Sequence, residues 1–328
     1  MKYQINKLAL LVFLLLFCLF PIIQESPYAD TPENDLFAHA LKQARAGKLR
    51  KAIDSWESII SLYPDAEKIS KVYGNIGIAY HNLGEIKKSI SYYKKALELE
   101  TKATEIIRVT GNYGKALHDL GEWENSNKFL KKLINMDPNG ESISWSYCII
   151  ADNYLSLEKP KEAIPYYEKG VTAISSGKAT IFTSKETELG DCYGNLSVAY
   201  VKDKQYQKAI DPGEKAIKFL KIGVLYTNLG EAYYYLKQYE KAKQYYKRGI
   251  SLGIDDLTVA GNIYLIAGMV ADALGEGEKA ISYTLKAKNK YRKTGDANSV
   301  SLAGHNLRIY YNKYEGKNQP QPVVEQPT

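Results

Sequence analysis

The segment Tyr73–Leu99 reads YGNIGIAYHNLGEIKKSISYYKKALEL, and the segment Tyr226–Leu252 reads YTNLGEAYYYLKQYEKAKQYYKRGISL. Both open with Tyr-x-Asn-(Ile/Leu)-Gly-x-Ala-Tyr. Both later carry Tyr-Tyr-Lys and, two residues on, a small residue followed by an aliphatic one. Such self-similarity within one chain is typical of repeat proteins. The internal repeat is therefore the feature that decides the fold.

Five further segments match the two quoted ones less closely. One small residue anchors the second half of each copy. Consecutive anchors are 37, 37, 37, 46, 33 and 38 residues apart. The anchors are Ala52, Ser89, Ser126, Ala163, Ala209, Ala242 and Ala280.

Apolar residues recur at helical spacing in both halves of a copy. Each copy therefore predicts two antiparallel helices of about three to four turns, joined by a turn. Neither helix buries its apolar face alone, so the copies are expected to stack into an all-α solenoid. The spacing is seen at Tyr226, Leu229, Gly230 and Tyr233 in the first helix, and at Tyr239, Ala242, Tyr246 and Ile250 in the second.

The pattern resembles the tetratricopeptide repeat family over about residues 33–290. In that family a large residue opens the first helix and a small residue follows four positions later, where the second helix approaches closely. The resemblance implies a right-handed α-solenoid of about seven helix-turn-helix units plus a C-terminal capping helix. The large residues are Leu36, Tyr73, Tyr147, Tyr193, Tyr226 and Tyr264, with Thr110 as the exception; the small ones are Ala40, Gly77, Gly114, Ala151, Ser197, Gly230 and Gly268.

The repeat register also divides the chain. We expect units one to four in 33–171, a spacer in 172–188, units five to seven in 189–290, a capping helix in 291–315 and a disordered Pro/Gln-rich tail in 316–328. Pro165 and Pro212 lie inside the predicted second helices of units four and five. Since an interior proline disrupts a helix, we predict a bend of the solenoid near the spacer. The alternative is a longer loop or an extended first helix.

The N-terminus differs in composition from the repeats. Lys2 and Lys7 precede the apolar run Leu8–Ile23, the layout of a secretory signal. The run is slightly short for a spanning helix, and Pro27 makes the cleavage site before Asp30 a poor one. Residues 1–29 are therefore predicted to be a signal peptide or an uncleaved signal anchor. Either way the body is exported and lies in the periplasm or another extracytoplasmic space, where an uncleaved segment anchors it to the inner membrane.

Motifs for chemistry are missing from the sequence. It holds no HExxH, GxSxG or P-loop, and its four histidines fall in different helices. No enzymatic activity, cofactor or metal is therefore expected. The net charge of +7 comes from scattered lysines, which gives no support for nucleic-acid binding. Cys148 and Cys192 either pair in an oxidising compartment or pack as small buried residues.

The family resemblance implies a concave groove lined by the first helices. A recurrent Asn lies beside that stripe, where its carboxamide either holds the backbone of an extended peptide or satisfies neighbouring helix groups. The Lys and Asn with which Hsp70- and Hsp90-binding members clamp a carboxylate are replaced here by Gly74 and Ile78, so we expect no co-chaperone activity. The candidate groove residues are Asn75, His81, Asn82, Arg108, Asn112, Lys115, His118, Asn195, Asn228, Glu231, Tyr234 and Tyr235, with Asp119 and Lys202 at the same spacing.

These features predict an exported or membrane-tethered scaffold that binds a protein or peptide partner in its groove. The alternative is a structural or accessory subunit of an envelope or secretion assembly, docked through basic rows on the second helices. Those rows are Lys87, Lys88, Lys94 and Lys95, and Lys243, Lys247 and Arg248. The large-residue positions of the repeat, such as Tyr226, Tyr233, Tyr239 and Tyr246, are expected to pack between helices, which accounts for much of the excess of 28 tyrosines over 7 phenylalanines. Tyr234 and Tyr235 remain as candidates for ligand contact.

Overall fold

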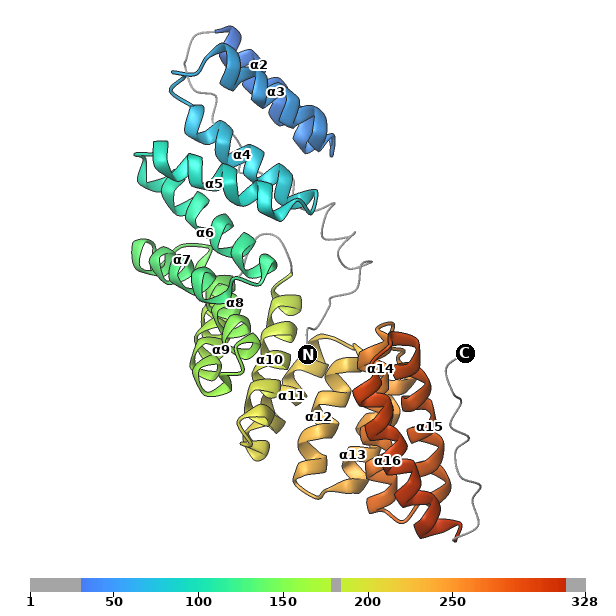
Figure 1. The fold of residues 1–328 in the computed structure, drawn as a ribbon. Helices are drawn as coiled ribbons and strands as arrows, with labels where there is room; N and C mark the ends of the chain where they lie inside the picture. Colours follow the sequence, from blue (N-terminus) through green and yellow to red (C-terminus); the bar gives the residue numbers. More distant parts are fainter. Residues whose placement is uncertain (1–30, 178–183, 317–328) are drawn as a thin grey trace, which may run out of the picture. The chain divides into compact units, whose positions relative to one another are not determined.

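The computed structural model describes residues 31–177 and 184–316. These residues form 15 helices and no strand, which confirms the predicted all-α fold (Figure 1). The predicted signal or anchor segment lies outside the described residues, as do residues 317–328 of the predicted tail. Among the described helices, none is both long enough and apolar enough to cross a bilayer.

The helices alternate between the first and second members of a repeat. The first helices are α2 (Pro32–Arg45), α4 (Ile69–Asn82), α6 (Ala103–Leu120), α8 (Ile143–Ser156), α10 (Lys185–Lys202), α12 (Gly223–Tyr235) and α14 (Leu257–Ala273). The second helices are α3 (Leu49–Leu62), α5 (Ile86–Leu99), α7 (Trp123–Met136), α9 (Pro160–Ser175), α11 (Tyr206–Phe219), α13 (Tyr239–Ser251) and α15 (Gly277–Thr294). A final helix, α16 (Ala297–Tyr314), packs on α15.

Two compact units divide the chain after Cys192, within α10. The predicted spacer 172–188 overlaps the end of α9 and the start of α10, and residues 178–183 lie outside the described part. The predicted bend of the solenoid stays a prediction. Unit 1 comprises residues 1–192 and unit 2 comprises residues 193–328.

The turn between the two helices of each repeat has the same conformation in all seven copies. One residue takes a positive φ, and it always stands five positions before the anchor residue. Four copies place Gly there, which adopts this region without strain. The other three place a side chain in it: Glu158, Lys204 and Lys237, with φ between 57° and 62°.

Close contact at small residues holds each helix pair together. All seven anchor residues on the second helices are 0% exposed. On the first helices, a Cβ added at Gly77 would lie 2.6 Å from the Tyr93 ring, and one at Gly114 would lie 2.7 Å from Leu130. Helices that approach this closely exclude any larger side chain at the crossing. The predicted role of the small positions is thus confirmed at these two crossings.

A pair of partly buried tyrosines with a lysine ammonium over the rings recurs in three repeats. Its residues keep one spacing: a Tyr on the first helix, a Tyr 19 positions later and a Lys 22 positions later. The ring centroids lie 6.1 to 6.3 Å apart and the ammonium nitrogens 5.5 to 5.9 Å from the rings, a cation–π arrangement. The three clusters are Tyr73, Tyr92 and Lys95; Tyr147, Tyr166 and Lys169; and Tyr264, Tyr283 and Lys286.

Neighbouring lysines of α5 allow the cation–π contact to be measured. We expect Lys95→Gln to lower the free energy of unfolding by about 0.5–1 kcal/mol, because it removes the cation from two tyrosine rings. Lys94→Gln is the matched control: Lys94 is exposed and should change stability by less than about 0.5 kcal/mol. Urea unfolding followed by circular dichroism measures both. Equal effects of the two replacements would contradict the cation–π contribution.

Pro165 and Pro212 lie inside α9 and α11, and both helices continue through them. The proline ring lacks an N–H, so the carbonyl four residues earlier loses its helical partner. Pro165 is exposed, whereas Pro212 is buried. The cost of Pro165 is therefore not offset by burial of its ring.

Replacement of Pro165 should stabilise unit 1. We expect Pro165→Ala to raise the free energy of unfolding by about 1–3 kcal/mol, since Ala restores the missing helical hydrogen bond. Pro160 occupies the first position of the same helix, where proline is favoured. Pro160→Ala, the control, should bring no gain in the same urea titration. A Pro165→Ala protein no more stable than the Pro160→Ala protein would refute the expectation.

Candidate functional site

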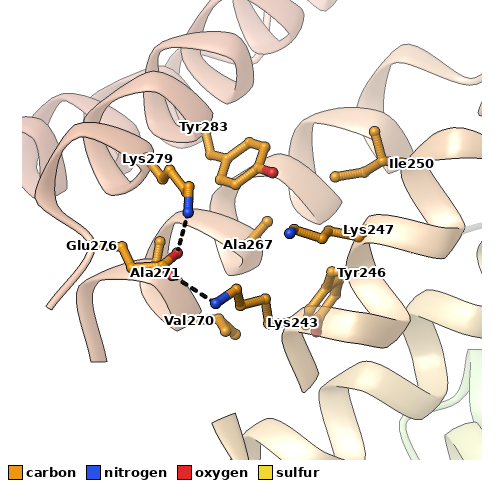
Figure 2. A pocket seen from close by; sticks show the side chains of 10 residues that line it. All are labelled: Lys243, Tyr246, Lys247, Ile250, Ala267, Val270, Ala271, Glu276, Lys279 and Tyr283. Carbon is orange, nitrogen blue, oxygen red and sulfur yellow. Dashed lines mark hydrogen bonds and ion pairs between the residues drawn. The ribbon is translucent and has the colours of Figure 1, made fainter. Parts of the chain in front are cut away.

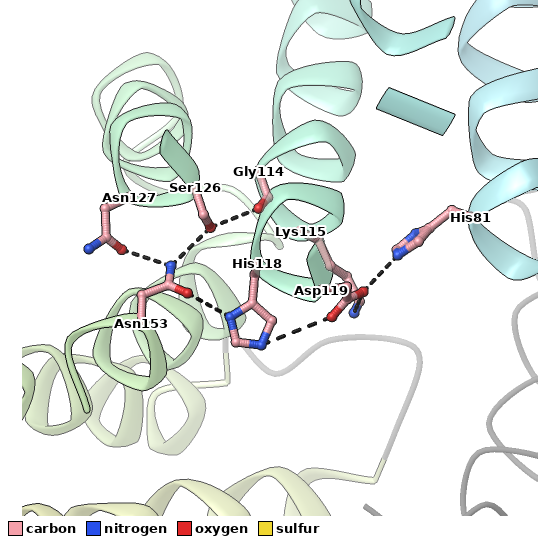
Figure 3. Close-up of polar contacts among 8 residues, drawn as sticks. All are labelled: His81, Gly114, Lys115, His118, Asp119, Ser126, Asn127 and Asn153. Atoms are coloured by element: carbon pink, nitrogen blue, oxygen red, sulfur yellow. Dashed lines mark hydrogen bonds and ion pairs between the residues drawn. The ribbon is translucent and has the colours of Figure 1, made fainter. Parts of the chain in front are cut away.

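Asp119, near the end of α6, connects two neighbouring first helices in unit 1. His81 Nε2, on α4, donates to Asp119 Oδ2 over 2.7 Å. Lys115 Nζ, one turn earlier on α6, donates to the same oxygen over 3.0 Å. Figure 3 shows both side chains directed at the carboxylate. The Asp119 side chain remains 30% exposed, so this pair of contacts lies at the surface.

The carboxylate of Asp119 is held in its charged form. Burial tends to raise its pKa, but the hydrogen bond from His81 and the positive charge of Lys115 lower it more. The pKa of Asp119 therefore lies well below its usual range.

A second set of hydrogen bonds continues from α6 to α7 and α8. His118 Nδ1 donates to Asn153 Oδ1 over 2.6 Å. Asn153 Nδ2 donates to Ser126 Oγ over 2.9 Å and to Asn127 Oδ1 over 2.8 Å, and Ser126 Oγ donates to the Gly114 carbonyl over 2.8 Å (Figure 3). We call these side chains the polar network. It comprises His81, Lys115, His118, Asp119, Ser126, Asn127 and Asn153, and it joins the first helices α4, α6 and α8.

The free energy of unfolding of unit 1 should depend on whether Asp119 is charged. Because its pKa is lowered on folding, Asp119 stabilises unit 1 above the unfolded-state pKa of about 4 and loses this effect as the pH falls towards the folded-state pKa. Asp119→Asn should cost about 1 kcal/mol at pH 7, and the difference from wild type should shrink between pH 4 and pH 2.5.

Urea titrations across that pH range test this expectation. Glu124→Gln is the matched control, because Glu124 is an exposed carboxylate on α7 outside the polar network. It should change stability little at any pH. A cost for Asp119→Asn that is the same at pH 7 and pH 3 would argue against the assigned role of the charge.

The recurrent asparagines in unit 1 are occupied or buried. Asn75 is 3% exposed, and neither atom of its amide has a hydrogen-bond partner among the described residues. Asn112 Nδ2 donates to the Arg108 carbonyl in its own helix over 3.1 Å. Arg108 itself pairs with Glu105 over 2.7 Å and lies against Gly74. Asn112 thus fits the interpretation that this asparagine forms a hydrogen bond with a backbone group of its own helix. Asn82 lies half-buried at the end of α4.

The remaining predicted residues lie in unit 2. Tyr235 is 47% exposed and stacks on Tyr206, with ring centroids 4.6 Å apart and planes 12° apart. Tyr234 meets Tyr235 edge to face at 5.4 Å. A hollow of about 370 Å³ beside Tyr206 is lined by Lys204, Gln205, Gln207, Lys208 and Leu236 as well.

Glu231 lies half-buried one turn before Tyr235 on α12. Burial raises its pKa, while the charge of Lys202 lowers it. Asn195 and Asn228 are half-buried, and both interact with neighbouring groups. The predicted residues thus form two groups, one in each unit.

Comparison with known protein families identifies the same repeat that the sequence pattern predicts. Sequence profiles of the tetratricopeptide repeat match residues 70–100, 146–175 and 224–256. These three segments are recognised as tetratricopeptide repeats. No curated protein matches the chain in sequence.

Solved structures share the fold of these tetratricopeptide repeats. A tetratricopeptide repeat protein from Parabacteroides merdae superposes with a TM-score of 0.56 at 15% identity, over 85% of this chain and 99% of that one. The C-terminal part of a TPR repeat-containing protein from Cytophaga hutchinsonii gives 0.58 at 16% identity, over 81% and 98%. The apo form of RapI gives 0.54 at 13% identity, over 88% and 100%. Identities this low establish the fold alone.

The basic rows on the second helices of the repeats are partly neutralised. Lys88 pairs with Glu85 over 2.7 Å, and Lys243 with Glu276 over 2.6 Å. Lys95 caps its tyrosine pair. The pocket beside Lys243, between α13, α14 and α15, has a volume of about 10 Å³ (Figure 2). That is room for one water molecule, so this pocket does not accommodate a ligand.

Sequence reasoning named four members of the polar network and missed three. Asn153, Ser126 and Asn127 were not among the expected site residues, although Ser126 is an anchor of the repeat. No spacing rule points to Asn153, because its partners belong to the preceding repeat. Among the described residues, no group of three or more His, Cys, Asp or Glu side chains is placed to hold a metal ion.

Proposed function

We propose that the chain is an exported or membrane-tethered scaffold whose first-helix face in unit 1 binds a protein or peptide partner. The polar network carries this proposal, because it joins three successive first helices into one partly exposed surface. The side chains of His81, Lys115 and His118 are 13%, 33% and 25% exposed. Tetratricopeptide repeats are typical of non-enzymatic scaffolds for protein–protein interaction.

Hydrogen bonding within the network favours binding in two ways. The side chains are held in place before a partner arrives, so less rotamer entropy is lost on association. The side chains of the network also differ in how easily a ligand group can replace their present hydrogen-bond partners. A cationic group on the ligand would compete with His81 and Lys115 for Asp119, whereas a carbonyl or carboxylate would reach the lysine and leave the contact between His81 and Asp119 intact. We therefore infer a partner segment rich in hydrogen-bond acceptors.

The export half of the proposal rests on the N-terminal sequence. Lys2 and Lys7 before the apolar run Leu8–Ile23 support a signal peptide or a membrane tether. The runner-up, docking of an accessory subunit through the second helices, is weakened by the ion pairs of Lys88 and Lys243. Such paired charges leave less net charge to attract an anionic surface.

Site-specific photocrosslinking in the producing cells tests the proposed face. A photoreactive residue at Lys115 should capture a protein partner, because this position lies at the centre of the polar network. The same residue at Lys132, which is exposed on the second helix α7 of the same repeat, is the matched control and should capture at least about tenfold less. Mass spectrometry identifies the product. Capture at position 132 but not at position 115 would favour the second-helix face and overturn the proposal.

A further inference from the structure

Two thiols meet between α8 and α10 in unit 1. Cys148 Sγ lies 2.7 Å from Cys192 Sγ, and both residues carry free thiols in the structure. Cys192 is 2% exposed and its thiol also donates to the Tyr167 carbonyl over 3.6 Å. Cys148 is partly exposed. A disulfide has an S–S distance of about 2.05 Å. The two sulfur atoms therefore need to move only slightly closer to form a bond.

The intervening second helix leaves space for this meeting. Gly170 of α9 lies against both sulfurs: a Cβ added there would be 2.6 Å from Cys148 Sγ and 3.2 Å from Cys192 Sγ. Any other residue at this position would force the sulfur atoms to move. Glycine inside a helix is unfavourable by itself, and here its missing side chain is what admits the sulfur pair.

We propose that Cys148 and Cys192 are a disulfide site, which fastens the first helix α8 to the first helix α10 when the chain meets a disulfide oxidant. The oxidant is a small-molecule disulfide or the disulfide of a thiol oxidoreductase. The bond closes the loop 148–192, which contains the whole of α9. It fixes α8, which also carries Asn153 of the polar network. This inference is independent of whether the first-helix face binds a partner.

The reaction proceeds by two thiol–disulfide exchanges. Cys148, the more exposed of the two, loses its proton to solvent, and its thiolate attacks one sulfur of the oxidant. The oxidant's S–S bond breaks, one thiolate leaves, and a mixed disulfide forms on Cys148. Cys192 then loses its proton and attacks the Cys148 sulfur, which releases the second thiolate. The two cysteines are oxidised by two electrons, and the oxidant is reduced to two thiols.

Neighbouring groups set the pH at which the exchange is fast. The hydrogen bond to Cys192 and burial raise the pKa of the Cys148 thiol, and the negative charges of Asp152 and Glu188 raise it further. Burial and the charges of the same two carboxylates raise the pKa of Asp191 on α10, and the Tyr167 hydroxyl on α9 donates to Asp152. Since only the thiolate reacts, the rate should rise with pH, at least about fivefold from pH 7 to pH 8.5.

The test uses the full chain carrying Cys18→Ser, so that only the pair remains. Oxidised glutathione at pH 8.5 should lower its intact mass by about 2 Da, with a peptide cross-link between positions 148 and 192. Closure of the loop should raise the thermal midpoint by about 5 °C, and a phosphine reductant should reverse both changes. Two thiols still open to alkylation after denaturation, or a cross-link between chains in place of the internal one, would overturn the proposal.

Two variants in the same background examine the separate steps. Cys192→Ala should accumulate the glutathione adduct on Cys148, because the resolving thiol is missing; no adduct would refute the assigned first step. Gly170→Ala should slow bond formation at least about tenfold while circular dichroism shows the helices intact. An unchanged rate in the folded Gly170→Ala protein would refute the role of Gly170. If that protein does not fold, oxidation of the Cys18→Ser chain decides the disulfide proposal, and the Cys192→Ala result decides its first step.

Discussion

Every repeat has a small residue where its two helices cross, and in the four repeats with glycine there a side chain of the second helix packs against the bare backbone of the first. At Gly77 the ring of Tyr93 occupies the space that a Cβ would need, and at Gly230 the ring of Tyr246 lies within 3.2 Å of that position. Tyr93 is fully buried and faces Tyr113 of the next repeat, with ring centroids 6.4 Å apart. The contact that pairs two helices therefore also sets the position of the following pair.

Tyrosine fits this architecture because a stack of helix pairs is only two layers thick. A tyrosine ring can be buried between the helices while its hydroxyl reaches water or a carboxylate, or while its exposed face contacts a cation. Tyr92 donates to Glu57 of the preceding repeat and lies under Lys95. Tyr233 stacks on Tyr245, and its hydroxyl donates to Glu214. The excess of tyrosine over phenylalanine thus follows from packing. Among the described tyrosines, only Tyr235, which contacts Tyr206 and Tyr234, is largely exposed.

The sequence predicts the structural features that every repeat shares, and it does not predict the side-chain contacts that occur in only one place. Helix pairs, small crossing residues and buried anchors recur in every copy, so their periodicity identifies them. The contact of His81 with Asp119, and that of His118 with Asn153, occur in single places and join residues 35 to 38 positions apart. Neither periodicity nor local propensity encodes such pairs. Asn75 shows the opposite difficulty: it matches the repeat motif, yet it is buried where the groove interpretation needs an accessible amide.

A partner that binds the first-helix face as proposed would use side chains of the polar network that also join neighbouring repeats. His81 and Asp119 hold α4 to α6, and His118 and Asn153 hold α6 to α8. The hydrophobic clusters between these helices are formed by other residues. A ligand that accepts a hydrogen bond from Lys115 changes only a contact within α6, whereas a ligand that engages His81 or His118 competes with a contact between repeats. In the proposed binding mode, a partner that engages these two histidines is therefore energetically coupled to the spacing of α4, α6 and α8.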